Sequence, residues 1–216
     1  MNKLFKFSCL LLLSATLAGC ETTYYNAMEK VGFHKREILV DRITAAQQAQ
    51  TEGRQQFKSA LEQFRSVVNF DGGELEQIYH RLNDEFERSE AVAAEISERI
   101  NSVDAVAEAL FDEWSEELDQ YSNGNLRRDS ARQLQDTQQR YQRLLTAMRK
   151  AQKSIDPVLD ALRDNTLYLK HNLNARAISS LKAELGTVNR NVSALITAMD
   201  QAIAESDSFL KQFKSS

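Results

Sequence analysis

Residues 75–121 decide the fold, and they read LEQIYHRLNDEFERSEAVAAEISERINSVDAVAEALFDEWSEELDQY. Apolar or small residues return every three or four positions along this stretch, which is the 3.5-residue period of a coiled-coil seam. The seam consists of Leu75, Ile78, Leu82, Phe86, Ser89, Ala93, Ile96, Ile100, Val103, Ala107, Leu110, Trp114, Leu118 and Tyr121. No part of the chain alternates with period two for long enough to indicate a strand. The pattern therefore predicts an all-α protein.

Three further stretches carry the same period. The first runs through Leu39, Ile43, Ala46, Gln50, Gly53, Phe57, Ala60, Phe64 and Val67. The third runs through Leu134, Thr137, Tyr141, Leu144, Met148, Ala151, Ile155, Val158, Leu162 and Leu169, and the fourth through Leu181, Leu185, Val188, Val192, Leu195, Met199, Ala202 and Phe209. The middle of the first seam is small and polar, so we expect either a close helix approach or a weak point there.

Turn-forming residues separate the four stretches. They lie at 69–73 (NFDGG), at 122–125 (SNGN) and at 172–174 (NLN), where Asn174 is a good N-cap. Pro157 either kinks the third helix or restarts it with Asp156 as the cap. The boundaries predict helices of about 25–68, 74–121, 126–172 and 175–213 in an elongated antiparallel four-helix bundle. The alternative is a fusion of the last two helices, with the chain paired to a second copy.

Charge differs strongly between the four stretches. Residues 71–121 contain three bases and sixteen acids, whereas residues 125–172 contain ten bases and five acids. An acidic helix between more basic neighbours is a pattern that selects partners and register in coiled coils, although a solvated face would read the same way. The acidic balance and the export signal described next argue against nucleic-acid binding.

The chain begins with MNKLFKFSCLLLLSATLAG at residues 1–19. Two lysines followed by a short apolar run are typical of a signal peptide, and the run is too short for a membrane-spanning helix. Residues 17–20, LAGC, resemble the lipobox of bacterial lipoproteins. The alternative is an ordinary cleaved signal with a chance cysteine beside the cut. The predicted organisation is a signal peptide at 1–19, a lipidated tether at 20–24 and a helical domain at 25–216.

The lipobox resemblance implies that Cys20 is acylated and becomes the first mature residue. Several acyl chains would anchor the protein stably, because each buried CH₂ adds roughly 0.8 kcal/mol of membrane affinity. Glu21 follows the cysteine in place of the aspartate that tends to retain lipoproteins in the inner membrane. The expected location is therefore the periplasmic side of the outer membrane. Cys9 leaves with the signal peptide, so no disulfide or thiolate metal site is expected.

No pattern in the chain predicts enzyme activity or a cofactor. His34 lies far from His80 and His171 in the predicted bundle, so the three histidines cannot form one metal site. The chain has no HExxH pattern, and Gly72-Gly73 lacks the lysine and the strand of a phosphate-binding loop. We expect a protein that is not an enzyme and that needs no metal or cofactor.

A dense polar cluster is predicted where residues 69–81 meet residues 164–176, at the end of the bundle far from the lipid. It is a candidate recognition tip for an envelope protein or polymer, although helix caps and solvated side chains would give the same pattern. The tip residues are Tyr79, His80, Tyr168, Lys170, His171, Asn172 and Asn174, with Asn165 and Arg176 beside them.

The opposite end carries both signs of charge. Arg127, Arg128, Lys211 and Lys214 are accompanied there by Glu113, Glu116, Glu117 and Asp119. Because these charges roughly cancel, the sequence does not predict a basic membrane patch.

Four stretches carry a family resemblance: EKVGFHKREILVDRI (29–43), FDGGELE (70–76), ALFDEWSEELDQYS (109–122) and PVLDALRDNTLYLKHNLNARAISSL (157–181). Over nearly its whole mature length the chain resembles a family of Gram-negative lipoproteins built on a domain of unknown function. The resemblance implies no activity, ligand or site residue. The leading hypothesis is a non-enzymatic, lipid-anchored scaffold or interaction protein of the cell envelope. The alternative is a carrier or sensor that holds an amphipathic ligand in the bundle core, and self-association is left open.

Overall fold

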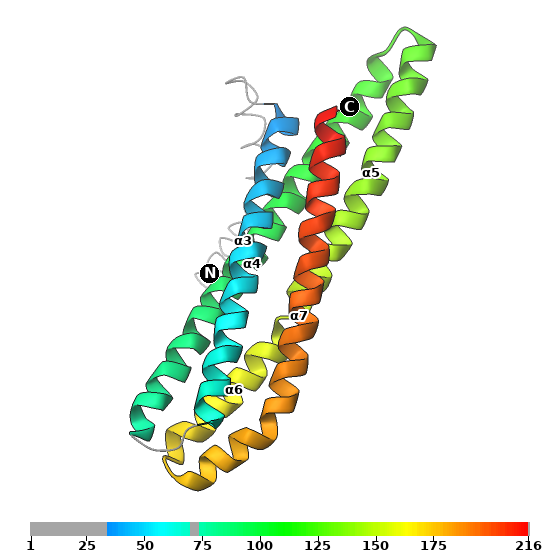
Figure 1. Cartoon of the computed structure of the whole chain (residues 1–216). Helices are drawn as coiled ribbons and strands as arrows, with labels where there is room; N and C mark the ends of the chain where they lie inside the picture. The colour runs from blue at the N-terminus through cyan, green and yellow to red at the C-terminus, as the bar shows by residue number, and fades with distance from the viewer. Residues whose placement is uncertain (1–33, 70–73, 216) are drawn as a thin grey trace, which may run out of the picture.

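The protein is an all-α helical bundle, and a computed structural model describes its residues 34–69 and 74–215 (Figure 1). Its elements are α3 (Lys35–Val68), α4 (Leu75–Glu117), the short 3₁₀ turn η1 (Leu118–Gln120), α5 (Gly124–Lys153), α6 (Asp156–His171) and α7 (Ala175–Ser215). No strand occurs in these two ranges. None of the described helices is both long enough and apolar enough to span a membrane. The signal peptide, Cys20 and the first nine residues of the predicted first helix lie outside the described residues.

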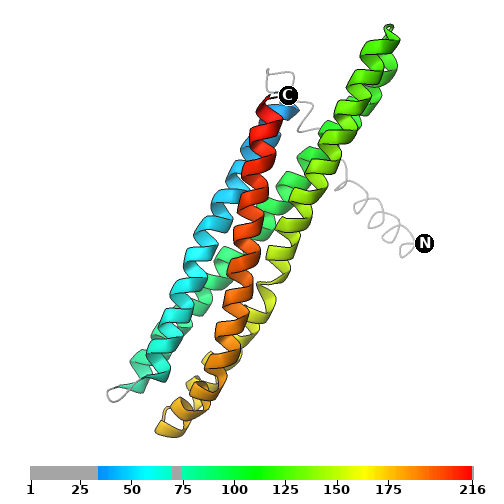
Figure 2. The same cartoon turned by 45° about the vertical axis from the view of Figure 1, so that its right-hand side comes forward.

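The helices form an antiparallel bundle with α5 and α6 stacked end to end as its third member (Figures 1 and 2). Helix α3 packs against α4 and α7, and the α5–α6 pair packs against α4 and α7 from the other side. The alternative in which the last two helices fuse is excluded, because α6 ends at His171 and α7 starts at Ala175. The four-helix prediction is confirmed.

The break between α5 and α6 shows how Pro157 acts. Pro157 occupies the first turn of α6, where the missing N–H costs no intrahelical bond. Helix α6 begins at Asp156 itself, and Ile155 takes the cap position that we had expected for Asp156. The Pro157 carbonyl oxygen accepts a hydrogen bond from Asn191 Nδ2 of α7 at 3.0 Å. The third helix is therefore restarted rather than bent.

The predicted seams form the core of the bundle. Along α4 the seam residues Ile78, Leu82, Ile96, Ile100 and Val103 are buried. The same seam becomes half-buried from Leu110 onward, through Trp114 and Leu118, and Tyr121 is exposed. Burial therefore fades toward one end of the rod, although the sequence pattern does not change.

That end of the rod is a two-helix overhang. Lys35 at the start of α3 forms an ion pair with Glu113 of α4 at 3.0 Å, and Arg140 of α5 donates to Gln212 near the end of α7 at 3.3 Å. The α4–α5 turn and the helix ends beside it therefore extend past the start of α3 and the end of α7, as Figures 1 and 2 show. We call residues Leu118–Arg128, at its extremity, the hairpin tip. Asn123 caps α5 there, with its side-chain oxygen accepting from the N–H groups of Asn125 and Leu126.

The small, polar middle of α3 proves to be a close helix approach. A Cβ atom added to Gly53 would lie 2.6 Å from Ile96 Cδ1, 3.2 Å from Val92 Cγ1 and 3.4 Å from Met199 Cε. Side chains of α4 and α7 therefore already fill the space that glycine leaves. Gln50, one turn earlier, is fully buried, and neither of its side-chain amide atoms has a hydrogen-bond partner.

We predict that Gly53→Ala and Gly186→Ala have different effects on stability. Both glycines lie inside helices, where alanine is favoured by about 1 kcal/mol. At Gly186 the new methyl group meets only Arg190 at 3.5 Å, so this variant should gain close to the full amount. At Gly53 the crowded methyl group should cancel the gain, because overpacking costs about 1–3 kcal/mol. Urea unfolding of both variants measures the difference, and equal stabilisation would show that the core at Gly53 is loose.

Near the overhang, an aromatic layer holds a buried phenol. Tyr141 is 2 % exposed, and its ring packs edge-on against Phe111 and Phe209, with ring centroids 5.4 and 6.3 Å away. Its hydroxyl donates to Asp104 Oδ1 at 2.8 Å, and Arg149 holds the other oxygen of that carboxylate at 3.0 Å. Burial, reinforced by the hydrogen bond to Asp104, raises the pKa of Tyr141 well above its ordinary range.

We predict an alkaline signature for Tyr141. The folded protein keeps this phenol protonated, whereas the unfolded chain ionises it near pH 10, so its contribution to stability is complete below that pH and is lost above it. At neutral pH, Tyr141→Phe should cost about 0.5–1.5 kcal/mol for the lost hydrogen bond. Between pH 9 and about pH 10.7 the gap between the variant and the parent should narrow by roughly 1 kcal/mol. A gap that stays constant over this range in denaturant unfolding would contradict the assignment.

Candidate binding groove at the distal end of the bundle

The predicted tip residues lie at the end of the rod opposite the hairpin tip. This distal end contains the start of α4, the end of α6 and the start of α7, and both α4 and α7 contact α6 (Figure 1). His80 and Lys170 are exposed, as is His171, while Tyr79 is half-buried against the core. His80 Nε2 lies 4.0 Å from Glu76 Oε1, and its ring centroid is 5.1 Å from that of Tyr79.

Two of the predicted tip residues are helix caps. The side-chain oxygen of Asn174 accepts from the backbone N–H groups of Arg176 at 3.0 Å and Ala177 at 3.2 Å, which confirms its expected N-cap position. Asn172 follows the last residue of α6, and its side-chain amide donates to the Tyr168 carbonyl at 2.9 Å. These two asparagines shape the turn between α6 and α7.

A groove of about 600 Å³ lies between α6 and α7, next to this turn. Its walls are residues spaced three and four apart on two antiparallel helices, so each helix contributes one continuous face. The lining residues are Ala161, Asp164, Asn165 and Tyr168 from α6, and Ser180, Leu181, Glu184 and Thr187 from α7. The predicted tip residue Tyr168 therefore belongs to a concave site.

The chemistry of the groove is acidic and rich in hydroxyl groups. Asp164 and Glu184 contribute carboxylates from opposite helices, and no lining residue is basic. The Tyr168 hydroxyl and Ser180 Oγ lie 3.3 Å apart and link the two walls. Asn165 is 7 % exposed, and its amide donates to the Ala161 carbonyl at 2.7 Å, so this part of the wall is fixed. Arg190 marks the rim, where it donates to Thr187 Oγ1 at 3.1 Å.

Exposed apolar side chains within residues 34–69 and 74–215 occur at the two ends of the rod. The large exposed hydrophobic residues are Tyr121 and Leu126 at the hairpin tip and Leu167, Tyr168 and Leu173 at the distal end. Among the described residues, the long sides of the rod carry no large exposed hydrophobic side chain. Scattered exposed apolar residues need no explanation, but a concentration at the extremities of a rod indicates where it makes contacts.

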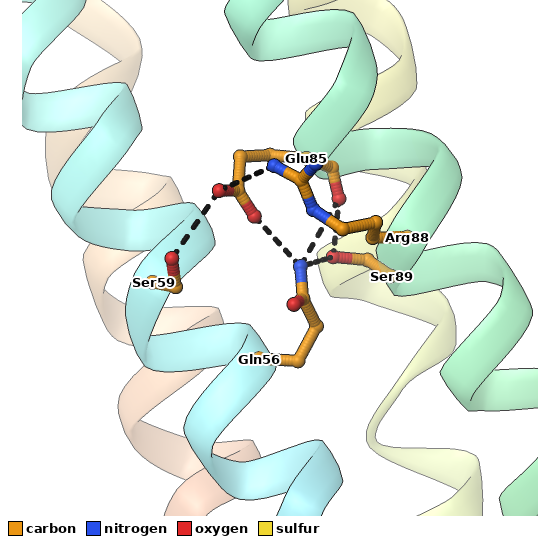
Figure 3. A network of polar contacts seen from close by, with 5 residues as sticks. All are labelled: Gln56, Ser59, Glu85, Arg88 and Ser89. Atoms are coloured by element: carbon orange, nitrogen blue, oxygen red, sulfur yellow. Dashed lines mark hydrogen bonds and ion pairs between the residues drawn. The ribbon is translucent and has the colours of Figure 1, made fainter.

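A second polar cluster joins α3 to α4 through hydrogen bonds among its own side chains (Figure 3). The Glu85 carboxylate accepts from Gln56 Nε2 at 2.7 Å, from Ser59 Oγ at 3.2 Å and from Arg88 at 2.8 Å. Ser89 is fully buried and donates to the Glu85 carbonyl at 2.7 Å. Because no hydrogen-bonding group of Glu85 is left for a ligand, we interpret this cluster as a lock on the register of the α3–α4 hairpin.

We predict that Glu85→Leu destabilises the bundle by about 1–3 kcal/mol. The substitution removes the carboxylate that the half-buried Gln56 amide and Ser59 hydroxyl donate to, and leaves Gln56 only longer contacts to Ser89 Oγ and the Glu85 carbonyl oxygen, at 3.4 and 3.5 Å. A matched control is Glu87→Leu, because Glu87 is exposed and bonds only to Asn83 four residues away. Thermal unfolding followed by circular dichroism should separate the two variants. Equal midpoints would show that the network adds nothing to stability.

The structure was also searched for side chains that could bind a metal ion. Among residues 34–69 and 74–215, no three His, Cys, Asp or Glu side chains come together in a way that could hold a metal ion. His34 lies just before α3, at the other end of the bundle from His80 and His171, as the sequence predicted.

Residues 24–213 match a protein family described as "protein of unknown function (DUF2959)". The chain belongs to this family. The matched segment contains every described helix of the bundle except the last two residues of α7. The family match therefore covers nearly the whole helical bundle. No curated protein and no solved structure matches the chain.

Sequence reasoning identified Tyr168 but not the groove around it. Ser180, Glu184 and Thr187 of α7 were missed, because they flank the seam and carry no motif. Their only signal is a run of small polar and acidic residues at helical spacing, which is also the signature of an ordinary solvated face. Glu85 was missed for a related reason. The seam was drawn through Phe86, and the neighbouring carboxylate is the more buried residue.

Proposed function

We propose that this protein is a non-enzymatic, lipid-anchored interaction protein of the bacterial cell envelope, facing the periplasm from the outer membrane. The support for anchoring is the sequence LAGC at residues 17–20, which matches a lipobox. The support for an interaction role is that the exposed apolar side chains and the groove lie at the ends of the rod. One end combines a groove with Leu167, Tyr168 and Leu173, and it is the end opposite the start of α3.

The dimensions of the bundle fit a spacer between a membrane and a partner. Helix α4 has 43 residues, which corresponds to roughly 65 Å at 1.5 Å per residue. Helix α3 begins at the hairpin-tip end, so a lipid on Cys20 would hold that end near the bilayer. The groove would then face away from the membrane, at a distance set by the length of the bundle.

The charge of the groove indicates the kind of partner segment that it would accept. Two carboxylates with no lysine or arginine in the lining favour a segment that carries positive charge. Tyr168 offers an aromatic face for such a cation, and the hydroxyl groups offer hydrogen bonds. The functional proposal therefore names a basic segment of an envelope protein as the ligand of the groove.

One observation favours the second candidate function, a carrier or sensor of an amphipathic ligand. Gln50 is a buried amide without a hydrogen-bond partner, and a ligand with a polar group would satisfy it. However, Ile96, Val92 and Met199 occupy the space beside Gly53, so a ligand would have to displace them. Native mass spectrometry of protein purified from membranes distinguishes the two functions, because a carrier would retain a small molecule.

We predict that a photocrosslinking residue at Tyr168 captures a defined envelope protein in intact cells. The same residue at Gln139, which is exposed on the side of α5, should not capture it. Asp164→Asn combined with Glu184→Gln should reduce the yield of that adduct at least tenfold, because the variant removes both negative charges from the groove. The double variant should keep parental helicity, since Asp164 and Glu184 are exposed.

Two outcomes would contradict the proposal. An adduct of equal yield at Gln139 would show non-specific proximity along the rod. An adduct at Tyr168 whose yield does not depend on Asp164 and Glu184 would show that the groove does not select a basic partner.

A further inference from the structure

The hairpin tip combines exposed apolar side chains with arginines, although the sequence of the chain as a whole is acidic. Tyr121 is 41 % exposed and Leu126 is 54 % exposed. Arg127 and Arg128 follow on the same turn of α5, and both are exposed. Residues 120–128, QYSNGNLRR, contain these two bases and no acid. The extremity of the rod therefore combines an aromatic side chain, a large aliphatic side chain and two guanidinium groups.

The acidic residues of the same end are placed differently in space. Glu113 is held at the base of the overhang by its ion pair with Lys35 at 3.0 Å. Glu116 and Glu117 belong to the last turn of α4, before η1. Asp119 is the one acid within the hairpin tip, and it pairs with Arg127 at 2.5 Å. Asp119 offsets one of the two arginines, so the hairpin tip as a whole keeps a net charge of +1.

The position of the tip points to one occupant. Helix α3 starts beside Glu113, at the end of the bundle from which the overhang projects, and thirteen residues of sequence, 21–33, separate Cys20 from His34. Thirteen residues can span up to about 45 Å, whereas the eight residues from Trp114 to Tyr121 rise only about 10 Å along a helix. The tip is therefore within reach of the surface that would hold the lipid.

We propose that the hairpin tip is a second membrane contact, which docks on the headgroup region of the bilayer that carries the lipid anchor. Tyrosine is suited to the boundary between water and acyl chains, and Leu126 supplies apolar area beside it. Arg127 and Arg128 would contact lipid phosphates, which guanidinium groups bind in a bidentate manner. This proposal rests on the lipid anchoring in the proposed function, because the anchor brings the tip to the membrane.

A second copy of the chain fits the tip less well. Two tips that meet end to end would bring four arginines together. In addition, copies anchored in one membrane point in the same direction and cannot meet end to end. A phosphate-bearing membrane surface carries the opposite charge to the arginines, and it lies in the direction in which the tip of an anchored rod points.

The test uses full-length mature protein, lipidated on Cys20, in vesicles of phosphatidylethanolamine and phosphatidylglycerol. The lipid occupies the chain's only mature cysteine, so a cysteine introduced at Ser122 is a unique thiol for an environment-sensitive fluorophore. Nitroxide groups on the lipid headgroups should quench this fluorophore at least fivefold more strongly than one placed at Lys170, at the distal end. Similar quenching at both positions would overturn the proposal.

The matched variants separate contact from mere proximity. Tyr121→Ser combined with Leu126→Ser should abolish most of the quenching at residue 122, and Arg127→Gln combined with Arg128→Gln should weaken it most at low salt. Leu173→Ser, at an exposed leucine of the distal end, should change nothing. Quenching that survives both pairs of substitutions would show that the tether alone keeps the tip near lipid, and the docking proposal would be wrong.

Co-flotation of the parent protein with the vesicles is scored first. Loss of flotation would refute the anchoring in the proposed function, whereas flotation without tip quenching would refute only the docking. In a separate unlabelled sample, disulfide-linked dimers through residue 122 would identify a second copy as the occupant and would also overturn the proposal.

Discussion

The seam of α4 is the constraint on which the structure depends. Its apolar residues can leave water only if neighbours flank the helix on both sides, and α3 and the α5–α6 pair provide those neighbours. The register is then fixed by polar contacts rather than by apolar packing alone. Glu85 receives Gln56 and Ser59 from α3, and Asp104 receives Tyr141 and Arg149 from α5. Heptad packing tolerates sliding, whereas these directional bonds do not.

In this arrangement the large apolar side chains are buried along the sides of the rod and exposed at its two ends. Along most of its length the bundle buries its large apolar side chains and pairs many of its charges between helices, as with Arg163 and Glu90 or Arg54 and Asp200. At the hairpin tip two helices continue without partners, so the seam emerges as Tyr121. At the distal end the short α6–α7 turn brings two helices together around an acidic groove. Both functional proposals follow from this contrast.

Periodicity was enough to predict the fold, because four seams of heptad spacing have few ways to be buried. It also located the helix breaks, including the N-cap at Asn174 and the interruption before Pro157. It could not predict where the neighbouring helices end, because Leu118 and Tyr121 continue the same pattern as Ile100 and Val103, yet Leu118 is only half-buried and Tyr121 is exposed. Helix length, not residue type, decides their exposure.

Only part of the candidate site could be predicted from the sequence, because the sequence pattern does not show which helix faces lie opposite each other. Tyr168 stood out in a dense polar stretch, but its partners on α7 look like any solvated face until the turn at 172–174 brings them opposite. The distal cluster also contained caps, Asn172 and Asn174, whose hydrogen bonds are local. Separating caps from contact residues required the geometry of the turn.

The central claim is that acyl chains on Cys20 hold this helical rod at a bacterial envelope membrane. Metabolic labelling with an alkyne fatty acid, combined with fractionation of cells that express the parent or Cys20→Ser, tests it most directly. The account predicts a labelled parent in the outer-membrane fraction and an unlabelled variant that no longer accumulates there. An unlabelled parent, or a Cys20→Ser variant that fractionates as the parent does, would contradict it.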